Sequence, residues 1–484
     1  MLYRYGTLKN DAVVSIPCAD ETAPPINRLP VELLAEILFR TLEQPDFTRR
    51  SYRGIPSKLS FSPGKDADPM LLAQVCRHWR SVALSTPLLW SSIKIRYAYK
   101  TKNRIPLLQT WLDRSGTCPL SIIIRELPLG FEDPAEWYSQ QRALKTEIMT
   151  LLISHSRRWK SVDFRFARRL PEALAALSPG SLPMLEFAAV QGRKENHDCL
   201  EEVVRDLDKF WDAAGTSLSL RKCKCDDQYC WHQYRHGRFR DMCWNQLTTI
   251  DVAMPPDFLF EILPSCRALT DLRYQECGEL SDDLRYRPSL TTVRKLENPI
   301  ILPYLRHLSM KTRFMTDFIF ESITTPSLVS VSIDQSPVPS TTHPKPSTFS
   351  GFLARSNCRL QIYSYDSYID LDDGGEDILL EILDSSSMSS LTDLTVYGST
   401  DMVKLIPFLA WTRERAKRLP RLQKLALHSI EPPSGALSEM ILSRRTSEGD
   451  GTIQLQELLL DFEISQVDLD TFDALRREGM VIFC

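Results

Sequence analysis

The chain has 484 residues, of which 43% are hydrophobic and 25% charged, a balance typical of a folded globular protein and not of a disordered one. This length exceeds what one compact core usually covers, so we expect more than one domain or an elongated repeat architecture. The formal net charge of -3 gives no reason to expect nucleic acid as a partner, because such binding depends on clustered lysine and arginine.

The N-terminal segment, residues 1–25, lacks the basic start and apolar run of a signal peptide, and we expect it to be a disordered tail. No stretch is apolar for long enough to predict a membrane span. Asn-x-Ser/Thr sequons are also absent from the sequence. These features predict an intracellular protein, cytoplasmic or nuclear, whose 12 cysteines are mostly reduced.

Two amphipathic helices are predicted next, because Pro30 and Pro69 each suit the first turn of a helix. Apolar residues at helical spacing form one side of the first helix, namely Leu33, Leu34, Ile37 and Leu38. The second helix has the corresponding set Leu72, Val75, Cys76, Trp79 and Ala83. A third, short helix is expected to begin at Pro87. Such a small unit cannot bury all these groups by itself, so they face either a partner protein or the rest of the chain.

The order of these motifs resembles an F-box. Residues 27–38 contain Leu-Pro followed by a leucine-rich helix, residues 75–83 contain Cys-Arg-His-Trp-Arg, and residues 87–90 close the motif with Pro-Leu-Leu-Trp. The resemblance implies a helical F-box-like domain at 26–95. Residues 39–67 form an inserted loop in it, longer than the connection usual in the family.

An F-box implies docking on the Skp adaptor and, through it, on a cullin. The residues expected to form the docking surface, with the tryptophans as hot spots, are Leu29, Pro30, Leu33, Leu34, Ile37, Leu38, Leu72, Val75, Cys76, Trp79, Leu89 and Trp90.

Beyond residue 95, short strands are predicted with apolar residues at their first, fourth and sixth positions. The clear copies are Leu247/Ile250/Val252, Leu269/Leu272/Tyr274, Leu305/Leu308/Met310, Leu328/Val331/Ile333, Leu391/Leu394/Val396, Leu422/Leu425/Leu427 and Leu455/Leu458/Leu460. A weaker copy lies near Leu360 and Ile362, and earlier trios are Trp159/Val162/Phe164 and Leu182/Leu185/Phe187. Helices are predicted at 257–263, 317–323, 376–383, 403–418 and 436–444.

This pattern resembles a degenerate leucine-rich repeat. It implies that residues 96–484 form an irregular α/β solenoid, so that the whole chain is of the α+β class. Buried strands of another α/β fold remain the alternative. Target specificity would come from the outward residues Asp271, Arg273, Arg306, His307, Ser330, Asp393, Thr395, Gln423 and Lys424.

Two inserts interrupt the repeat pattern, and a further segment is rich in cations. The insert near 221–244 contains Cys223, Cys225, Cys230 and His232, which are ligand types for structural zinc, although a basic loop with incidental thiols is the preferred interpretation. The proline-rich insert near 336–350 is interpreted as a flexible loop, with a regulatory phosphosite cluster as the alternative. Residues 157–169 alternate cations with aromatics, which indicates a strand with one solvated face or a clamp for an acidic motif.

No glycine-rich phosphate loop, nucleophile elbow or zinc-protease helix occurs, so we expect neither an enzyme nor a cofactor. The resemblance implies a substrate-recognition adaptor of a Skp–cullin–F-box ubiquitin ligase that binds an unknown protein target. A scaffold without a ubiquitination role is the alternative. Long chains of this kind look like an expanded F-box set of mushroom-forming fungi. Neither membrane nor nucleic acid is expected as a partner.

Overall fold

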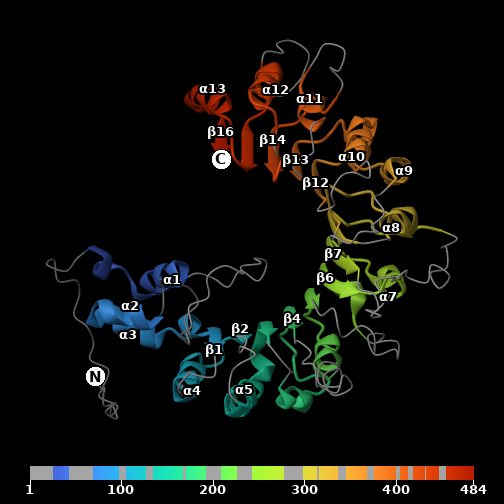
Figure 1. The fold of residues 1–484 in the computed structure, drawn as a ribbon. Coiled ribbons are helices and arrows are strands. Elements are labelled where there is room, and N and C mark those ends of the chain that lie inside the picture. The colour runs from blue at the N-terminus through green and yellow to red at the C-terminus, as the bar shows by residue number, and fades with distance from the viewer. Residues whose placement is uncertain are drawn as a thin grey trace. The chain divides into compact units, whose positions relative to one another are not determined.

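The computed structural model describes most of the chain between residues 25 and 483. The described ranges are 25–42, 69–97, 105–126, 135–166, 171–191, 209–225, 242–276, 298–312, 315–335, 345–367, 375–398, 404–411, 418–430, 432–445 and 454–483. Helices and strands alternate along the chain, which confirms the predicted α+β class (Figure 1). The predicted tail, apart from Pro25, and nearly all of the predicted 39–67 loop lie outside these ranges.

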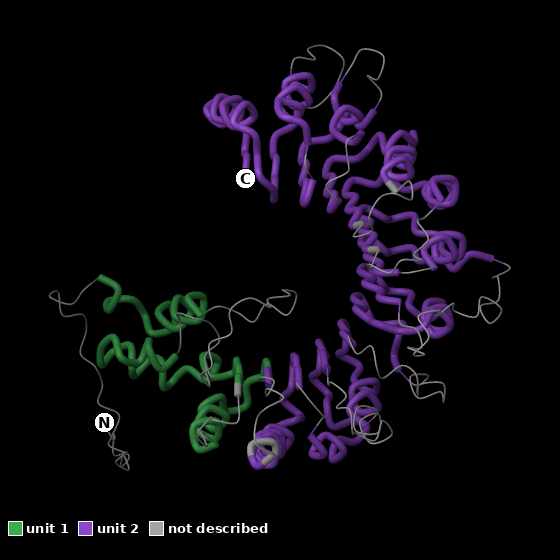
Figure 2. Tube along the Cα trace, viewed as in Figure 1, with its two compact units in different colours: residues 1–96, 101–123 green, residues 97–100, 124–484 purple. Residues whose placement is uncertain are grey.

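The chain divides into two compact units, residues 1–96 with 101–123 and residues 97–100 with 124–484 (Figure 2). Unit 1 is mainly helical. Its elements are η1 (Pro25–Arg28), α1 (Val31–Thr41), α2 (Pro69–Val75), α3 (Arg77–Ser85), η2 (Pro87–Trp90), β1 (Ser92–Tyr97), α4 (Ile105–Arg114) and the first part of β2 (Leu120–Glu126). The predicted domain boundary after residue 95 stays a prediction.

Trp90 lies at the centre of unit 1 and is 1% exposed. Its indole Nε1 donates a hydrogen bond to the carbonyl of Ala83 at 2.8 Å, and its ring meets Trp111 edge-on at 4.9 Å between centroids. The guanidinium of Arg114 lies over the same ring, 4.5 Å from its centroid. Trp90 therefore connects α3, η2 and α4.

The second helix was predicted as one continuous element. This prediction is wrong, because the helix is interrupted at Cys76, between α2 and α3. Cys76 is extended, with φ -157° and ψ 173°, and its Sγ accepts a hydrogen bond from the backbone N–H of Trp79 at 3.4 Å. This thiol satisfies one of the free N–H groups at the start of α3. Leu72 and Val75 therefore belong to α2, and Trp79 belongs to α3.

Unit 2 is built on parallel strands. In the order in which they pair, they are β3 (Trp159–Arg165), β4 (Phe187–Gln191), β5 (Lys222–Cys225), β6 (Thr249–Met254), β7 (Asp271–Glu276), β9 (His307–Lys311), β11 (Ser330–Gln335), β12 (Ile362–Ser367), β13 (Asp393–Tyr397), β14 (Lys424–His428), β15 (Glu457–Asp461) and β16 (Val481–Phe483). A separate parallel pair joins β8 (Ile300–Ile301) to β10 (Ile323–Thr324).

Helices connect these strands. They are α5 (Ala135–Ile153), η3 (Ser156–Arg158), η4 (Glu172–Ala176), η7 (Trp244–Gln246), α7 (Pro256–Ile262), η8 (Leu263–Ser265), α8 (Thr316–Ser322), α9 (Pro346–Ser356), α10 (Gly375–Asp384), η10 (Ser386–Met388), α11 (Leu405–Leu409), α12 (Ala436–Arg445) and α13 (Gln466–Arg477). Within unit 2 the labelled helices lie together on one face of the sheet (Figures 1 and 2). We call the opposite face the open face.

The predicted leucine trios explain the register of this sheet. Ile250, Leu272 and Leu308 pair across β6, β7 and β9, and the ladder continues through Val331 on β11 to the later strands. All are almost completely buried, because every second side chain of a strand points to the same face. The core of unit 2 is therefore a ladder of apolar side chains between sheet and helices.

Several predicted elements are displaced in the structure. The trio that began at Leu182 is wrong in register, since β4 buries Ala188 and Val190 instead of Phe187. Ile362 is exposed, and β12 buries Tyr363 and Tyr365 in its place. The helix predicted at 403–418 ends at Leu409, where Ala410 becomes extended.

The loop predicted near 336–350 extends too far, because its last residues belong to helix α9. Helix α9 begins at Pro346 because the fixed φ of proline suits the first helical position. Residues 336–344 lie outside the described part of the chain.

Asp468 connects the last two helices. Its carboxylate accepts hydrogen bonds from the backbone N–H groups of Gly435 and Ser438, at 3.1 and 2.9 Å, and from the hydroxyls of Ser438 and Ser465, at 2.7 and 2.6 Å. Burial by itself would raise the pKa of Asp468, but these hydrogen bonds lower it below its ordinary value.

We expect Asp468→Ala to lower the free energy of unfolding by about 2–4 kcal/mol, because several buried donors lose a charged acceptor. Urea unfolding at pH 7 measures this loss. The lowered pKa means that the stabilisation is present above the ordinary carboxyl pKa of about 3.9 and is lost as the pH falls through the folded value. The difference between wild type and variant should therefore shrink below about pH 4, and a difference that grows there would contradict this account.

Candidate protein-binding surfaces

The helices of unit 1 carry many exposed apolar side chains. Val75 is 61% exposed and Leu33 is 54% exposed. Among the described residues of this unit, the other exposed large apolar side chains are Ile26, Val31, Ile37, Leu71, Leu84 and Leu88. Both α1 and α2 pack on α3, so these side chains come from neighbouring helices. Large apolar groups gathered on one small unit are typical of a protein-binding surface.

The predicted docking residues fall into three groups. Those exposed are Pro30, Leu33, Ile37 and Val75; those half-buried are Leu29, Leu72, Cys76 and Trp79; those buried in unit 1 are Leu34, Leu38, Leu89 and Trp90. The apolar stripe predicted on the first helix is thus split, with Leu34 and Leu38 inward and Leu33 and Ile37 outward. Buried members can serve a docking surface only by holding the outer residues in place.

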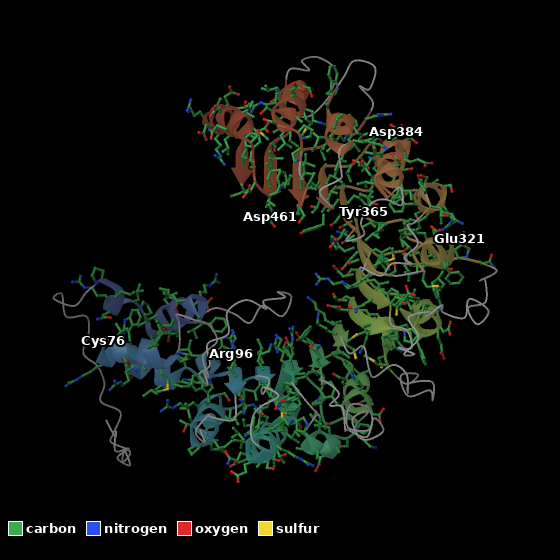
Figure 3. All side chains as sticks on the ribbon, in the orientation of Figure 1. Cys76, Arg96, Glu321, Tyr365, Asp384 and Asp461 are labelled. Atoms are coloured by element: carbon green, nitrogen blue, oxygen red, sulfur yellow. The ribbon has the colours of Figure 1, made fainter. Side chains whose placement is uncertain are left out.

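Trp79 is placed both to contact a partner and to hold the helices of unit 1 together. Its indole is half-buried, and its Nε1 donates a hydrogen bond to the side-chain oxygen of Asn27 at 3.1 Å. This bond ties α3 to the turn that precedes α1. Cys76, labelled in Figure 3, lies directly before α3. The exposed Val31, Leu71 and Leu88 were not predicted as docking residues, although they lie beside predicted ones.

The open face of unit 2 is polar. It carries the strand residues that alternate with the core ladder, such as Asp251 on β6, Arg273 on β7, Ser309 on β9 and Ser332 on β11, which neighbour one another in register. A surface of this kind can bind a partner through charges and hydroxyl groups.

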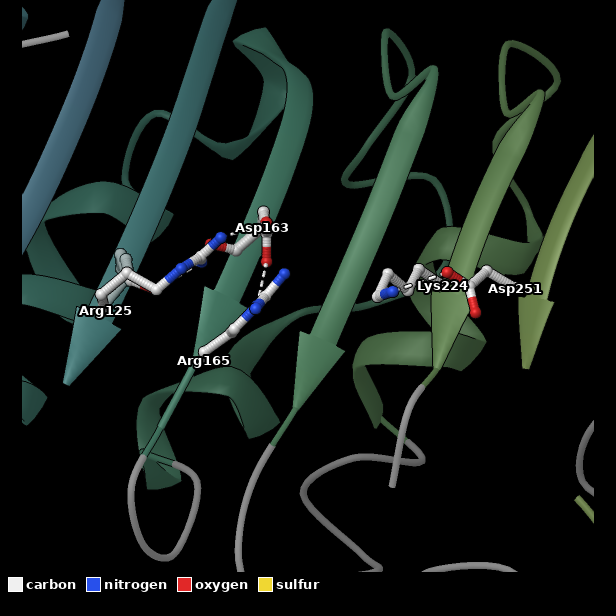
Figure 4. A network of polar contacts seen from close by, with 6 residues as sticks. Arg125, Asp163, Arg165, Lys224 and Asp251 are labelled. Atoms are coloured by element: carbon white, nitrogen blue, oxygen red, sulfur yellow. Dashed lines mark hydrogen bonds and ion pairs between the residues drawn. The ribbon is translucent and has the colours of Figure 1, made fainter. Parts of the chain in front are cut away.

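Ion pairs fill part of the open face (Figure 4). Asp163 on β3 is almost fully buried and pairs with Arg125 on β2 and, at 3.4 Å, with Nε of Arg165. Further along the sheet, Nζ of Lys224 on β5 lies 2.6 Å from Oδ2 of Asp251. These side chains are already engaged in ion pairs with one another, so they are less available to bind the charges of a partner.

The cation-rich segment 157–169 includes strand β3. Trp159, Val162 and Phe164 enter the core, while Lys160 is exposed and lies 3.6 Å from Glu186. Arg165 pairs with Asp163. This arrangement matches the interpretation as a strand with one polar face. Residues 167–169 lie outside the described part of the chain.

The middle of the open face contains a row of charges. Nζ of Lys311 on β9 lies 3.0 Å from Oδ2 of Asp334 on β11, and Asp366 on β12 is the register neighbour of Asp334. Burial, together with repulsion from Asp334, raises the pKa of Asp366 to about 6. Lys311 lowers this pKa in part, but it forms its ion pair with Asp334, and Asp366 has no ion pair with a described residue.

At the C-terminal side of unit 2 the open face becomes aromatic. Tyr397 on β13 stacks on His428 on β14, with ring centroids 4.1 Å apart. Nδ1 of His428 lies 3.5 Å from Oδ2 of Asp461 on β15, which Figure 3 labels. Beyond them Phe483 on β16 is exposed.

The structure places the predicted specificity residues at or directly before the starts of strands, except Arg273 and Thr395, which lie within β7 and β13. Arg273, Arg306, His307 and Lys424 are exposed, and half-buried positions are taken by Asp271, Ser330, Asp393, Thr395 and Gln423. Nζ of Lys424 lies 2.8 Å from Oε2 of Glu457. Arg273 differs from Lys424 in that its side chain forms no ion pair with any residue that the structure describes.

Two of the candidate zinc ligands belong to the core. Cys223 and Cys225 lie on strand β5, where Leu220, Cys223 and Cys225 repeat the trio pattern of the other strands. The interpretation of this part as an insert is therefore wrong. Cys230 and His232 lie outside the described residues. Among the residues that are described, no group of histidine, cysteine and acidic side chains could hold a metal ion.

Burial raises the pKa of the Cys223 thiol far above its ordinary value, and burial also raises that of Cys266 to about 12. We expect both to resist iodoacetamide at pH 8 in the folded chain and to react in urea, because only the thiolate is a nucleophile. Peptide mass spectrometry after timed labelling measures this. Rapid labelling of Cys223 in the folded chain would contradict its placement in the core.

No described helix is long and apolar enough to cross a membrane. No protein-family model matches the chain, and no curated protein matches it either.

Proposed function

We propose that this chain is a substrate-recognition adaptor of a Skp–cullin–F-box ubiquitin ligase. Unit 1 docks on the Skp adaptor, and unit 2 holds a target protein on its open face. The cullin and the remaining subunits then bring ubiquitin to that target, and this chain contributes proximity without chemistry of its own.

One observation carries the proposal. The helices with the F-box-like motifs expose large apolar side chains, among them Leu33, Ile37 and Val75. Full burial of such a side chain contributes roughly 1.5–3 kcal/mol, so a partner that covers several of them gains a substantial part of a stable interface. The buried Leu34, Leu38 and Trp90 keep the helices together beneath that surface.

The target-binding part of the proposal rests on unit 2. Its strands are parallel and in register, its apolar trios form a continuous ladder, and its labelled helices lie on one face. These features support a degenerate leucine-rich-repeat-like solenoid. The open face then offers polar and aromatic side chains from successive strands to a target.

A scaffold that binds the Skp adaptor without ubiquitination is the second candidate, because both functions share the same docking surface. Target turnover separates the two. Proteins captured by the wild-type chain are identified, and their half-lives are compared in cells with the wild type and with a Leu33→Asp, Val75→Asp variant. The ligase proposal predicts captured proteins that persist longer with the variant and lose their ubiquitin chains. Equal half-lives and equal ubiquitination would support the scaffold instead.

A further inference from the structure

Arg273 provides an exposed guanidinium on the described part of the open face. Arg273 on β7 is exposed and forms no ion pair with any described residue. Its register neighbour on β6 is Asp251, whose carboxylate pairs with Lys224. Its register neighbours on the other side are Ser309, Ser332 and Ser364, on β9, β11 and β12. All three are half-buried, so they form a low floor of hydroxyl groups beside Arg273.

On the other side of this floor lies the carboxylate of Asp366, which is close enough to Lys311 for that lysine to lower its pKa, although Lys311 forms its ion pair with Asp334. Asp366 on β12 pairs with no described cation, and its Oδ1 is buried without a hydrogen-bond partner. Its neighbour Asp334 is already paired with Lys311. The raised pKa of Asp366 has the same origin, namely burial and the nearby Asp334 charge. An added cation at this point would offset the repulsion from Asp334.

The two groups are separated by the strand order β7, β9, β11, β12. Each step across a sheet is about 4.8 Å, and Asp366 lies two residues further along β12 than Ser364, so the two residues lie on the order of 16 Å apart. An extended polypeptide advances about 3.3 Å per residue and covers this distance in roughly four or five residues. The serine hydroxyls between them can both donate and accept hydrogen bonds with the backbone of such a segment.

We propose that the open face between β7 and β12 binds an extended segment of a target protein that carries an acidic residue and a basic residue roughly four or five positions apart. The acidic side chain pairs with Arg273, and the basic one pairs with Asp366. Complementary charges at both ends make the site specific for this spacing. The inference deepens the proposed function and rests on it only in calling the ligand a ubiquitination target.

A displayed library of random peptides, selected on the immobilised full chain, tests the inference. The selected peptides should share an acidic and a basic residue at this spacing. Their affinity should fall by about tenfold or more with Arg273→Glu or Asp366→Lys, and should fall as salt rises. Exchanging the acidic residue of the peptide for lysine should restore binding to the Arg273→Glu chain. That rescue also shows that the variant is folded.

Two matched variants serve as controls. Arg477→Glu and Asp470→Lys make the same charge changes at exposed positions on α13, away from these strands, and they should leave the affinity unchanged. Selection of no peptide, peptides without the spacing, or equal losses in the control variants would overturn the inference. Binding to the Skp adaptor is measured on the same chains. If the wild-type chain did not bind the Skp adaptor, the proposed function would be contradicted, while the peptide result would still hold.

Discussion

Replacing Leu33 and Val75 together by aspartate should weaken binding to the Skp adaptor by at least about 100-fold, because each leucine or valine contributes roughly 1.5 kcal/mol or more when buried. Both side chains are exposed in the structure, so the charges should not disturb the core of unit 1. Affinity is measured with purified proteins by titration calorimetry. The melting temperature of the variant should stay close to that of the wild type.

Leu218→Asp provides the matched control. Leu218 lies in unit 2 and is 77% exposed, so the same change of an exposed leucine to aspartate is made away from the proposed docking surface. Its affinity for the Skp adaptor should equal that of the wild type. Unchanged binding by the Leu33→Asp, Val75→Asp variant would show that these side chains do not meet the adaptor.

Trp90→Ala should abolish docking by another route, namely by unfolding unit 1. Removal of a buried tryptophan costs about 3–5 kcal/mol, and here it also removes the hydrogen bond to Ala83 and the contacts with Trp111 and Arg114. Hydrogen exchange followed by mass spectrometry should show faster exchange in α3 and η2. The Leu33→Asp, Val75→Asp variant should show no such change.

This comparison separates a core tryptophan from a contact tryptophan. The sequence indicated Trp90 as a hot spot, whereas the structure places it inside unit 1. If Trp90→Ala lost docking while exchange in α3 and η2 stayed slow, Trp90 would contact the adaptor directly and its place in the core would be wrong. Trp90→Phe keeps most of the ring volume and should retain docking. Its free energy of unfolding should fall by about 1 kcal/mol, because the hydrogen bond is missing.

The strands of unit 2 were the most predictable part of the fold. A strand with one face packed against helices needs apolar side chains on that face, and the trio Leu305, Leu308 and Met310 shows this directly in the sequence. The same rule would have found β5, had Cys223 and Cys225 been treated as small apolar residues and not as metal ligands.

The candidate surfaces were harder to predict, because periodicity defines the face of a helix but not its neighbours. Leu33 and Leu34 are adjacent in the sequence, and only the packing of α1 on α3 decides which one points outward. The extended conformation of Cys76 likewise depends on its role as the cap of α3. The unpaired state of Asp366 follows from strand register, which brings Asp334 beside it and directs Lys311 to Asp334.

The most direct measurement of the central claim is a calorimetric titration of the full chain with the purified Skp adaptor. The proposal predicts a complex of one chain with one adaptor and a Kd below about 1 μM, as expected for an interface built on several buried apolar side chains. A folded chain that gives no binding at concentrations well above this value would contradict the adaptor function.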